Sequence, residues 1–245
     1  MAKFLHYEPC PRCREKGNDN RGDNCAVYSD GGSHCFSCGF HKFPKHYVKP
    51  TEEKVNGSKI LPIDFSREVP VRAWKWLLQW GLPMSYWQGK VGWSEKDIRL
   101  VFTENTFSIG RWQPEFQLAL PPEEKPPRKW FVWGNPHQAP VIFGDYGKSK
   151  EIILVEDIIS ANKLGRLTCS IPLFGTKVFN GVLPILRHIG LPVVLWQDKD
   201  QQACQPQRCH NLSLLTGLPV RYVVTDNDPK ALSGEQIHEA LGSST

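Results

Sequence analysis

The sequence predicts an α/β protein built from three parts: an N-terminal ribbon held by cysteines, a small basic α+β subdomain, and a parallel sheet with helices on both of its faces. Three observations predict this arrangement. Two CxxC pairs lie in a glycine-rich N-terminal segment, short apolar runs bounded by Gly and Pro fill the middle, and strand-like runs alternate with helix-like runs after Lys150. A chain of 245 residues is long enough for one large domain and a small one.

The N-terminal domain, residues 1–45, has too few aliphatic residues to form a core, so it needs disulfides or a bound metal to hold it together. Its pairs CPRC and CFSC are separated by 21 residues, a spacing typical of an N-terminal zinc ribbon with four thiolate ligands. Disulfides or a redox CxxC are the alternatives, and both are less common in a cytosolic chain without a thioredoxin-like βαβ context. The predicted ligands of one structural Zn²⁺ are Cys10, Cys13, Cys35 and Cys38.

Basic and aromatic side chains surround these cysteines, and such side chains contact phosphates and stack on bases. The alternative is that the aromatic ones simply cover the zinc site. The residues are Arg12, Arg14, Lys16, Arg21, Tyr28, His34, Phe36, Phe40 and Lys42.

Residues 46–66 form a predicted linker, because they are polar and charged and are interrupted by Pro50, Gly57 and Pro62. The basic α+β subdomain, residues 67–147, begins with VRAWKWLLQWGL, whose apolar residues recur at helical spacing. The runs DIRLVFT, FSIGRW, FQLALP and KWFVWG then predict antiparallel strands, with PPEEKPP as a mobile loop.

The positive charge of the chain lies mainly in this middle segment. Residues 71–150 carry a net charge of +4 and residues 151–245 carry −1, within a total of +5. This distribution favours a polyanion bound by the middle segment, and the alternative is an ordinary solvated surface. Eight of the nine tryptophans also lie there, and most are expected in the core. One or two are candidates to stack on template bases beside the predicted nucleotide- and template-binding residues Arg111, Arg128 and Lys129.

The last part, residues 148–245, alternates strands and helices. EIILVE, CSIPL, LPVVLW and PVRYVV predict strands that are apolar on both faces. IISANKLGRL, VLPILRHI, residues 206–215 and SGEQIHEAL predict helices, the last of them capped by Ser233. Ligands of such parallel sheets bind at the carboxyl ends of the strands.

Acidic residues follow three of these strands. Glu156 ends EIILVE, Asp198 and Asp200 follow VVLW, and Asp226 and Asp228 follow RYVV. Aspartates are common in loops that cap helices, which is the simpler explanation for any one group. Three groups at one sheet edge favour a divalent cation, because crowded carboxylates repel one another without a counter-ion. A glutamate beside such a cluster can bind metal or move a proton.

The motifs together resemble a known family. YEPCPRC followed by YSDGGSHCFSCGFH resembles the zinc-binding domain of DNA primases, especially the primase part of bacteriophage primase-helicases. IILVEDIISANKLG, PLFGTKVF, VVLWQDKD and TDNDPKAL are similar, in order and spacing, to the motifs of the Toprim fold in those primases. The likeness covers the ribbon and about residues 140–230, and it implies a Toprim-like parallel sheet in residues 148–245.

The resemblance also implies roles for single residues. Glu156 matches the Toprim glutamate, Asp198 and Asp200 match the pair that binds catalytic Mg²⁺ or Mn²⁺, and Asp228 matches a third acidic position. Arg111 and Lys129 fall where such primases carry basic residues that face the nucleotide or template.

Two departures from the family pattern affect the loops around the predicted metal site. Asp157 follows the glutamate where the family often has glycine. QQACQPQ replaces a glycine that usually follows the DxD motif, and Pro206 is expected to delay the next helix. Altered or reduced activity is therefore an expectation.

The implied activity is that of a DNA primase, a DNA-directed RNA polymerase that makes short RNA primers on single-stranded DNA from ribonucleoside triphosphates. Two alternatives stay open: a non-catalytic zinc/Toprim DNA-binding protein of the recombination-mediator kind, and a Toprim nuclease. About 110 residues separate Cys38 from the EIILV strand, and this basic interval favours the primase over the mediator.

Partners and location follow from what the sequence lacks. It has no GxxxxGK[ST] phosphate loop, so we expect a separate replicative helicase as partner. It has no signal peptide and no apolar run near 18 residues, so we expect no membrane contact and a cytoplasmic location, in the host cytoplasm if the protein belongs to a phage.

Overall fold

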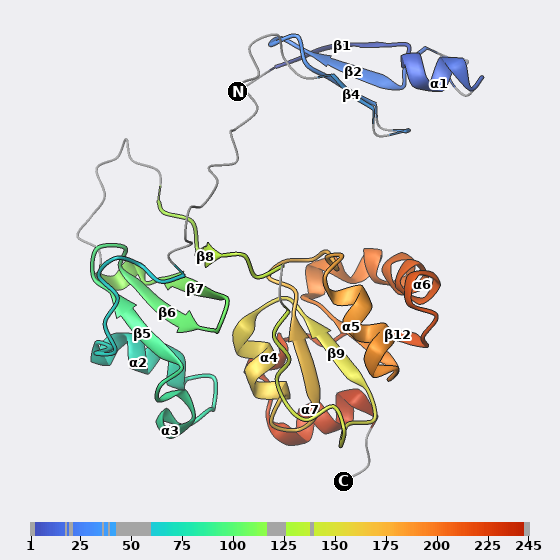
Figure 1. Ribbon diagram of the computed structural model, residues 1–245. Coiled ribbons are helices and arrows are strands. Elements are labelled where there is room, and N and C mark those ends of the chain that lie inside the picture. The colour runs from blue at the N-terminus through green and yellow to red at the C-terminus, as the bar shows by residue number, and fades with distance from the viewer. Residues whose placement is uncertain are drawn as a thin grey trace. The chain divides into compact units, whose positions relative to one another are not determined.

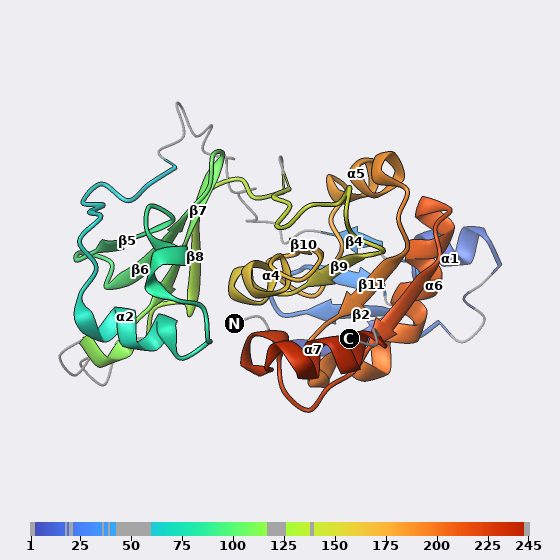
Figure 2. The same ribbon diagram turned by 90° about the horizontal axis from the view of Figure 1, so that it is seen from below.

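A computed structural model describes the protein over residues 3–17, 19, 22–35, 37–38, 40–42, 60–116, 126–137 and 140–242. The chain divides into two compact units, Met1–Gly57 and Ser58–Thr245, whose elements are shown in Figures 1 and 2. Most of the predicted linker and of the PPEEKPP loop lies outside the described residues. The predicted four-part division at residues 45, 66 and 147 therefore stays a prediction.

The N-terminal unit contains an antiparallel sheet of four short strands in the order β1-β2-β3-β4. These are β1 (Phe4–Glu8), β2 (Cys25–Tyr28), β3 (Ser33–Cys35) and β4 (His41–Lys42), and helix α1 (Pro11–Glu15) follows β1. The buried apolar side chains among its described residues are four cysteines and Ala26. A core this small does not hold such a unit together by itself.

The second unit begins with two short helices and an antiparallel sheet in the order β5-β6-β7-β8. The elements are α2 (Val71–Leu78), α3 (Met84–Trp87), β5 (Val91–Ser94), β6 (Arg99–Thr103), β7 (Phe107–Trp112), the 3₁₀ turn η1 (Pro114–Phe116) and β8 (Trp130–Gly134). The predicted helix and three of the predicted strands are confirmed. The FQLALP strand is wrong at Phe116, which ends η1, and residues 117–120 lie outside the described part.

A parallel sheet in the order β10-β9-β11-β12 follows, with all three pairings parallel. Its strands are β9 (Ile152–Val155), β10 (Cys169–Pro172), β11 (Val193–Trp196) and β12 (Val220–Val223). The helices are α4 (Ile158–Leu164), α5 (Val182–Ile189), α6 (Gln205–Thr216) and α7 (Gly234–Leu241), with 3₁₀ turns η2 (Lys199–Cys204) and η3 (Pro229–Ala231). The predicted mixed α/β class with a parallel sheet is confirmed.

Helices cover both faces of this sheet, as predicted. Ile152 and Leu154 point into a core shared with α5 and α6. Ile153 and Val155, which alternate with them along β9, point into a core shared with α4 and α7. Ser233 caps α7 as expected, in a reciprocal pair of hydrogen bonds with Gln236.

The antiparallel sheet and helix α4 share a hydrophobic core. Ile158 and Ile159 of α4 are buried in the same cluster as Trp87 of α3. The Tyr86 hydroxyl donates to Asn162 Oδ1 at 2.8 Å, which ties α3 to the same helix. These contacts hold the two sheets of this unit together and shape the space between them.

No helix among the described residues is long and apolar enough to span a membrane.

Glu104, in the loop after β6, gives a pH-dependent prediction. Burial raises its pKa from 4.5 to about 6, although the charge of Lys90 opposes this. Because the raised pKa means that the folded state prefers the protonated carboxyl, this contribution to stability is full below pH 4.5 and is lost as the pH rises through 6. Glu104→Gln is therefore expected to raise the thermal unfolding temperature at pH 7–8 and to change it little near pH 4.5. Unfolding curves across this pH range check it, and a difference that does not depend on pH would contradict it.

Candidate active site and metal centre

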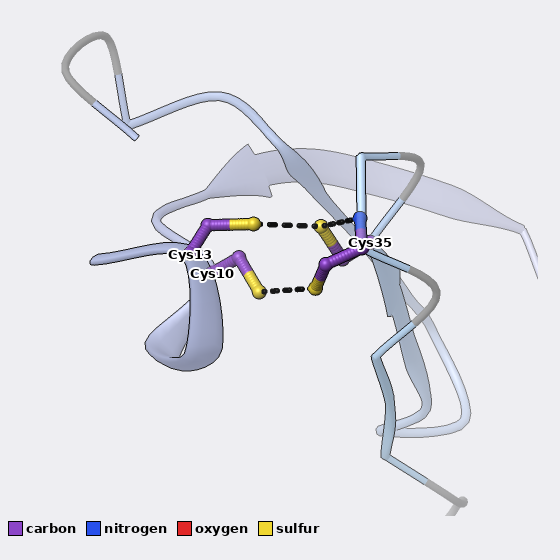
Figure 3. A group of neighbouring side chains, drawn as sticks. Cys10, Cys13 and Cys35 are labelled. Carbon is purple, nitrogen blue, oxygen red and sulfur yellow. Dashed lines mark hydrogen bonds between the residues drawn. The ribbon is translucent and has the colours of Figure 1, made fainter. Parts of the chain in front are cut away.

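The four predicted zinc ligands come together in the N-terminal unit. The sulfur of Cys10 lies 3.6 Å from that of Cys38, and the sulfur of Cys13 lies 3.7 Å from that of Cys35. A tetrahedral Zn²⁺ with Zn–S bonds of about 2.3 Å requires sulfur atoms about 3.8 Å apart. Figure 3 shows the side chains of Cys10, Cys13 and Cys35 extending toward one another, with dashed lines marking the sulfur–sulfur contacts. The geometry therefore fits one Zn²⁺.

Hydrogen bonding prepares this cluster for a cation. Burial would raise the pKa of Cys35, but backbone N–H groups of Cys38 and Ser37 outweigh this effect and lower its pKa to about 7. Burial raises the pKa of Cys13 to about 12, so a bound cation is needed to ionise this thiol at neutral pH. Cys25 pairs with Cys35 across β2 and β3, but it does not belong to the four-sulfur cluster.

The surface of the ribbon carries aromatic residues that the sequence reasoning missed. Phe4 and Tyr7 of β1 are more than half exposed, with ring centroids 4.9 Å apart. Tyr28, which was predicted at this surface, meets Phe4 at 6.4 Å. Phe40 packs against the cysteines, as the alternative reading of the aromatic residues expected. The predicted surface residues Arg21 and Phe36 lie outside the described residues.

The register of the parallel sheet gathers the acidic residues at one edge. Val155, Trp196 and Val223 are aligned across β9, β11 and β12, so the three strands end together. Glu156 follows the first strand directly, and the backbone N–H of Asp198 donates to its Oε1 at 3.3 Å.

A cavity of about 790 Å³ lies between this edge and the antiparallel sheet. One side, the acidic wall, consists of Glu156, Asp157, Asp198 and Asp228, together with Lys230. The other side, the aromatic wall, consists of Trp76, Trp80, Arg111, Lys129 and Trp130. The cavity therefore brings carboxylates, cations and flat rings together around one space.

Burial and mutual repulsion disfavour the ionised form of two carboxyl groups in the acidic wall. Burial, followed by the charges of Asp228 and Glu156, raises the pKa of Asp198 to about 7. Burial also raises the pKa of Glu156, against the hydrogen bond from Asp198. A divalent cation would relieve this repulsion, and carboxylate oxygens are its usual ligands.

The carboxylates of the acidic wall suit a cation that keeps part of its water shell, as Mg²⁺ does, better than a cation that needs a complete cage of protein ligands. Among the described residues, only the four cysteines place three or more ligand atoms all within 4.8 Å of one another. The carboxylate oxygens are more widely spread. Mg²⁺ keeps several waters and is usually held by one or two carboxylates, so a hydrated Mg²⁺ suits Glu156, Asp198 and Asp228.

Lys230 is a site residue that the sequence reasoning missed. Its ammonium lies 3.0 Å from Asp157 Oδ2 and also contacts Asp228 Oδ2. Burial would lower the pKa of Lys230, but the charges of Asp157 and Asp228 outweigh this and raise it. The sequence DPK after β12 could have indicated Lys230, because it places a basic residue two positions after the predicted ligand Asp228.

Three predicted or considered residues lie away from the cavity lining. Asp200, in η2, is exposed, although its charge acts on Glu156. Asp226 is 85% exposed and pairs with Lys199 at 2.6 Å. Arg128 accepts a hydrogen bond through its backbone carbonyl from Arg99, and its side chain is exposed.

Arg111 is the most distinctive residue of the aromatic wall. Its guanidinium lies 5.4 Å from the ring centre of Trp76 and 5.6 Å from that of Trp130. It forms no ion pair with a described carboxylate, and its Nε has no hydrogen-bond partner. A half-buried guanidinium at a cavity wall, without an ion pair to a described carboxylate, is suited to bind phosphate oxygens.

Hydrogen bonds from helix α6 hold the altered loop after Asp200 in place. The 3₁₀ turn η2 spans Lys199–Cys204 and so includes QQAC, and α6 begins at Gln205 with Pro206 in its first turn, as expected. Arg208 of α6 donates to Gln197 at 2.6 Å and to Gln201 at 2.9 Å. These bonds fix the loop to the end of β11, beside Asp198.

These features define a class of protein: an α/β chain with a four-thiolate ribbon and a parallel sheet whose acidic edge faces a basic, aromatic wall. No protein-family model and no curated protein sequence matches the chain. Among solved structures it is similar to the primase of Aquifex aeolicus, in its zinc-binding and RNA polymerase domains. The TM-score is 0.54 with 13% sequence identity, over 99% of this chain and 80% of that chain. At this identity the likeness shows the fold, and the phage type and the Toprim assignment stay predictions.

Proposed function

We propose that the protein is a phage-type DNA primase with a Toprim catalytic part, which makes short RNA primers on single-stranded DNA. The observation that carries the proposal is the cavity itself. Its acidic wall is suited to a divalent cation, and its aromatic wall is suited to phosphates and bases. The fold shared with a primase supports the proposal.

In this proposal each wall has a task. Arg111 and Lys129 bind the phosphates of the nucleotide or the template, and Trp76 or Trp130 offers a ring face to a base. Asp198 and Asp228, with the exposed Asp200 whose charge acts on Glu156, hold Mg²⁺, and Glu156 is a further ligand or the base that accepts the 3′-hydroxyl proton. When bound, Mg²⁺ neutralises charge that develops on the triphosphate during nucleotidyl transfer.

The zinc ribbon supplies a second contact with DNA in this proposal. Its exposed rings at Phe4 and Tyr7 and the basic residues of α1, Arg12 and Arg14, suit single-stranded bases and phosphates. A separate replicative helicase as partner stays a proposal.

One assay separates the proposed function from its alternatives. The protein is incubated with single-stranded DNA, Mg²⁺ and labelled ribonucleotides. Short labelled products that depend on the template sequence support a primase. Shortened DNA would identify a nuclease, and a mobility shift without products would identify a DNA-binding protein.

Arg111→Gln tests the aromatic wall. The variant removes a guanidinium that forms no ion pair with a described carboxylate and is therefore available to a phosphate. Because this phosphate contact is lost, we expect the KM for ribonucleotide to rise about tenfold or more. Arg111→Lys restores the charge but not the planar group and is expected to recover part of the loss. Arg72→Gln, an equal change at an exposed position of α2 outside the cavity, is the control. Steady-state kinetics measure the effect, and an unchanged KM in Arg111→Gln would contradict it.

A further inference from the structure

The acidic wall already contains one cation that belongs to the protein. Lys230 is the second residue of η3, and its ammonium contacts both Asp157 and Asp228. Its side chain is 17% exposed, so water competes weakly for these contacts. Glu156 and Asp198 form no ion pair among the described residues. The wall therefore has one side, at Asp228, in direct contact with Lys230, and an open side at Glu156 and Asp198, on which the charges of Arg208 and Lys230 act without a direct ion pair.

Asp157 fixes the ammonium from a position that is not free to bind metal. Its Oδ1 accepts the backbone N–H groups of Ile159 and Ser160 at 2.8 and 3.0 Å, which caps α4. Its Oδ2 accepts the Ser160 hydroxyl at 2.8 Å and pairs with Lys230. A carboxylate engaged on both oxygens acts as an anchor for Lys230.

The backbone of Lys230 is held as well. Lys163 of α4 donates to the carbonyl of Lys230 at 2.8 Å and to the carbonyl of Trp80 at 2.9 Å. The ring centre of Trp80 lies 5.6 Å from the Lys230 ammonium. With its backbone and its ammonium both tied to α4, Lys230 has a fixed position in the wall.

We propose that Lys230 is a built-in counter-ion that competes with divalent cations for Asp228, so that the nucleotide-free site binds one divalent cation rather than two. A fixed unit charge in contact with Asp228 repels a dication there and leaves Glu156 and Asp198 as the open side. The inference rests on the proposed function, because it assumes that the acidic wall holds Mg²⁺. The inference also explains why an aspartate stands at position 157, where the family that the sequence resembles often has glycine: Asp157 holds the Lys230 ammonium in place.

The test is a Mn²⁺ titration followed by electron paramagnetic resonance, without nucleotide or DNA. Wild-type protein is expected to bind about one ion at the acidic wall, and Asp198→Asn is expected to lose it. Lys230→Gln keeps hydrogen-bond donors but removes the charge, so we expect a second bound ion or at least about tenfold tighter binding. Lys230→Arg is expected to behave like the wild type.

A matched control removes an equal charge from the same sheet edge. Lys199→Met deletes the exposed partner of Asp226, outside the cavity, and is expected to leave Mn²⁺ binding within about twofold. Lys230→Met, whose apolar chain can pack on Trp80, is the second variant if Lys230→Gln does not fold.

The outcomes distinguish this inference from the proposed function. If the wild type binds no Mn²⁺ that depends on Asp198, the magnesium site of the proposed function is wrong and the inference with it. If the wild type binds one such ion and neither neutral Lys230 variant binds more ions or binds them more tightly, the counter-ion inference alone is overturned.

Discussion

Replacing Asp198 with asparagine is expected to slow template-dependent dinucleotide synthesis at least about a hundredfold. The side chain lies half-buried beside Glu156 and Asp228, and asparagine keeps its shape but not its charge. Glu156→Gln is expected to give a similar loss. The rate is measured with labelled ribonucleotides on a single-stranded template at saturating Mg²⁺.

The same substitution is expected to leave stability unchanged or to increase it. Burial and neighbouring carboxylates hold the pKa of Asp198 at about 7, so its ionised form is disfavoured in the folded protein. Asparagine removes this repulsion. Loss of activity together with an equal or higher unfolding temperature would show that the lost function is chemical and not a failure to fold.

Asp226→Asn is the matched control for this prediction. Asp226 lies in the same loop as Asp228 but is 85% exposed and paired with Lys199, outside the cavity. Its neutralisation is expected to change the rate by less than about twofold. If Asp226→Asn were as damaging as Asp198→Asn, or if Asp198→Asn kept normal synthesis, the assignment of the acidic wall would be wrong.

Loss of the zinc site is expected to unfold the N-terminal unit and leave the second unit folded. Cys35→Ser removes one of four ligands, and the buried apolar residues described in this unit are cysteines and Ala26 alone. In such small domains metal binding provides most of the folding free energy, about 10–16 kcal/mol in zinc-finger peptides. We expect about one zinc per chain in the wild type and much less in the variant.

Metal analysis and two-dimensional NMR check this prediction. The signals of Met1–Gly57 are expected to collapse in Cys35→Ser, while those of Ser58–Thr245 stay dispersed. Cys25→Ser makes the same change at the buried neighbour of Cys35 across the β2–β3 pair and is expected to retain zinc. Protein purified without chelator that contains no metal would contradict the prediction.

Much of the fold could be predicted because its signals are local. The strand–helix alternation after Lys150 and the spacing of the CxxC pairs depend on residues that are close in the sequence. We expected Glu156 and Asp198 at the same end of the sheet because parallel strands that end in register bring their following residues together. β9 and β11 do end in register. The prediction of a strand at FQLALP was wrong at its first residue, because a short apolar run occurs both in strands and in turns and does not distinguish them.

The candidate site could be predicted only in part, because loop side chains point where distant partners hold them. Asp226 turns outward to Lys199, while Asp228, two residues away, turns to Lys230 and the cavity. Sequence spacing does not separate these two aspartates. The rings beside Arg111 likewise come from α2 and β8, which are far apart in the sequence.

The sequence by itself therefore determined the class of fold, the four thiolates and the set of carboxylates from which a site could be built. The tertiary structure decided which carboxylates face the cavity, which basic residue faces them, and that Lys230 is paired with Asp157, 73 residues away in the chain. The physical reason is that periodicity and spacing act within one element, whereas burial and charge pairing depend on groups that folding brings together.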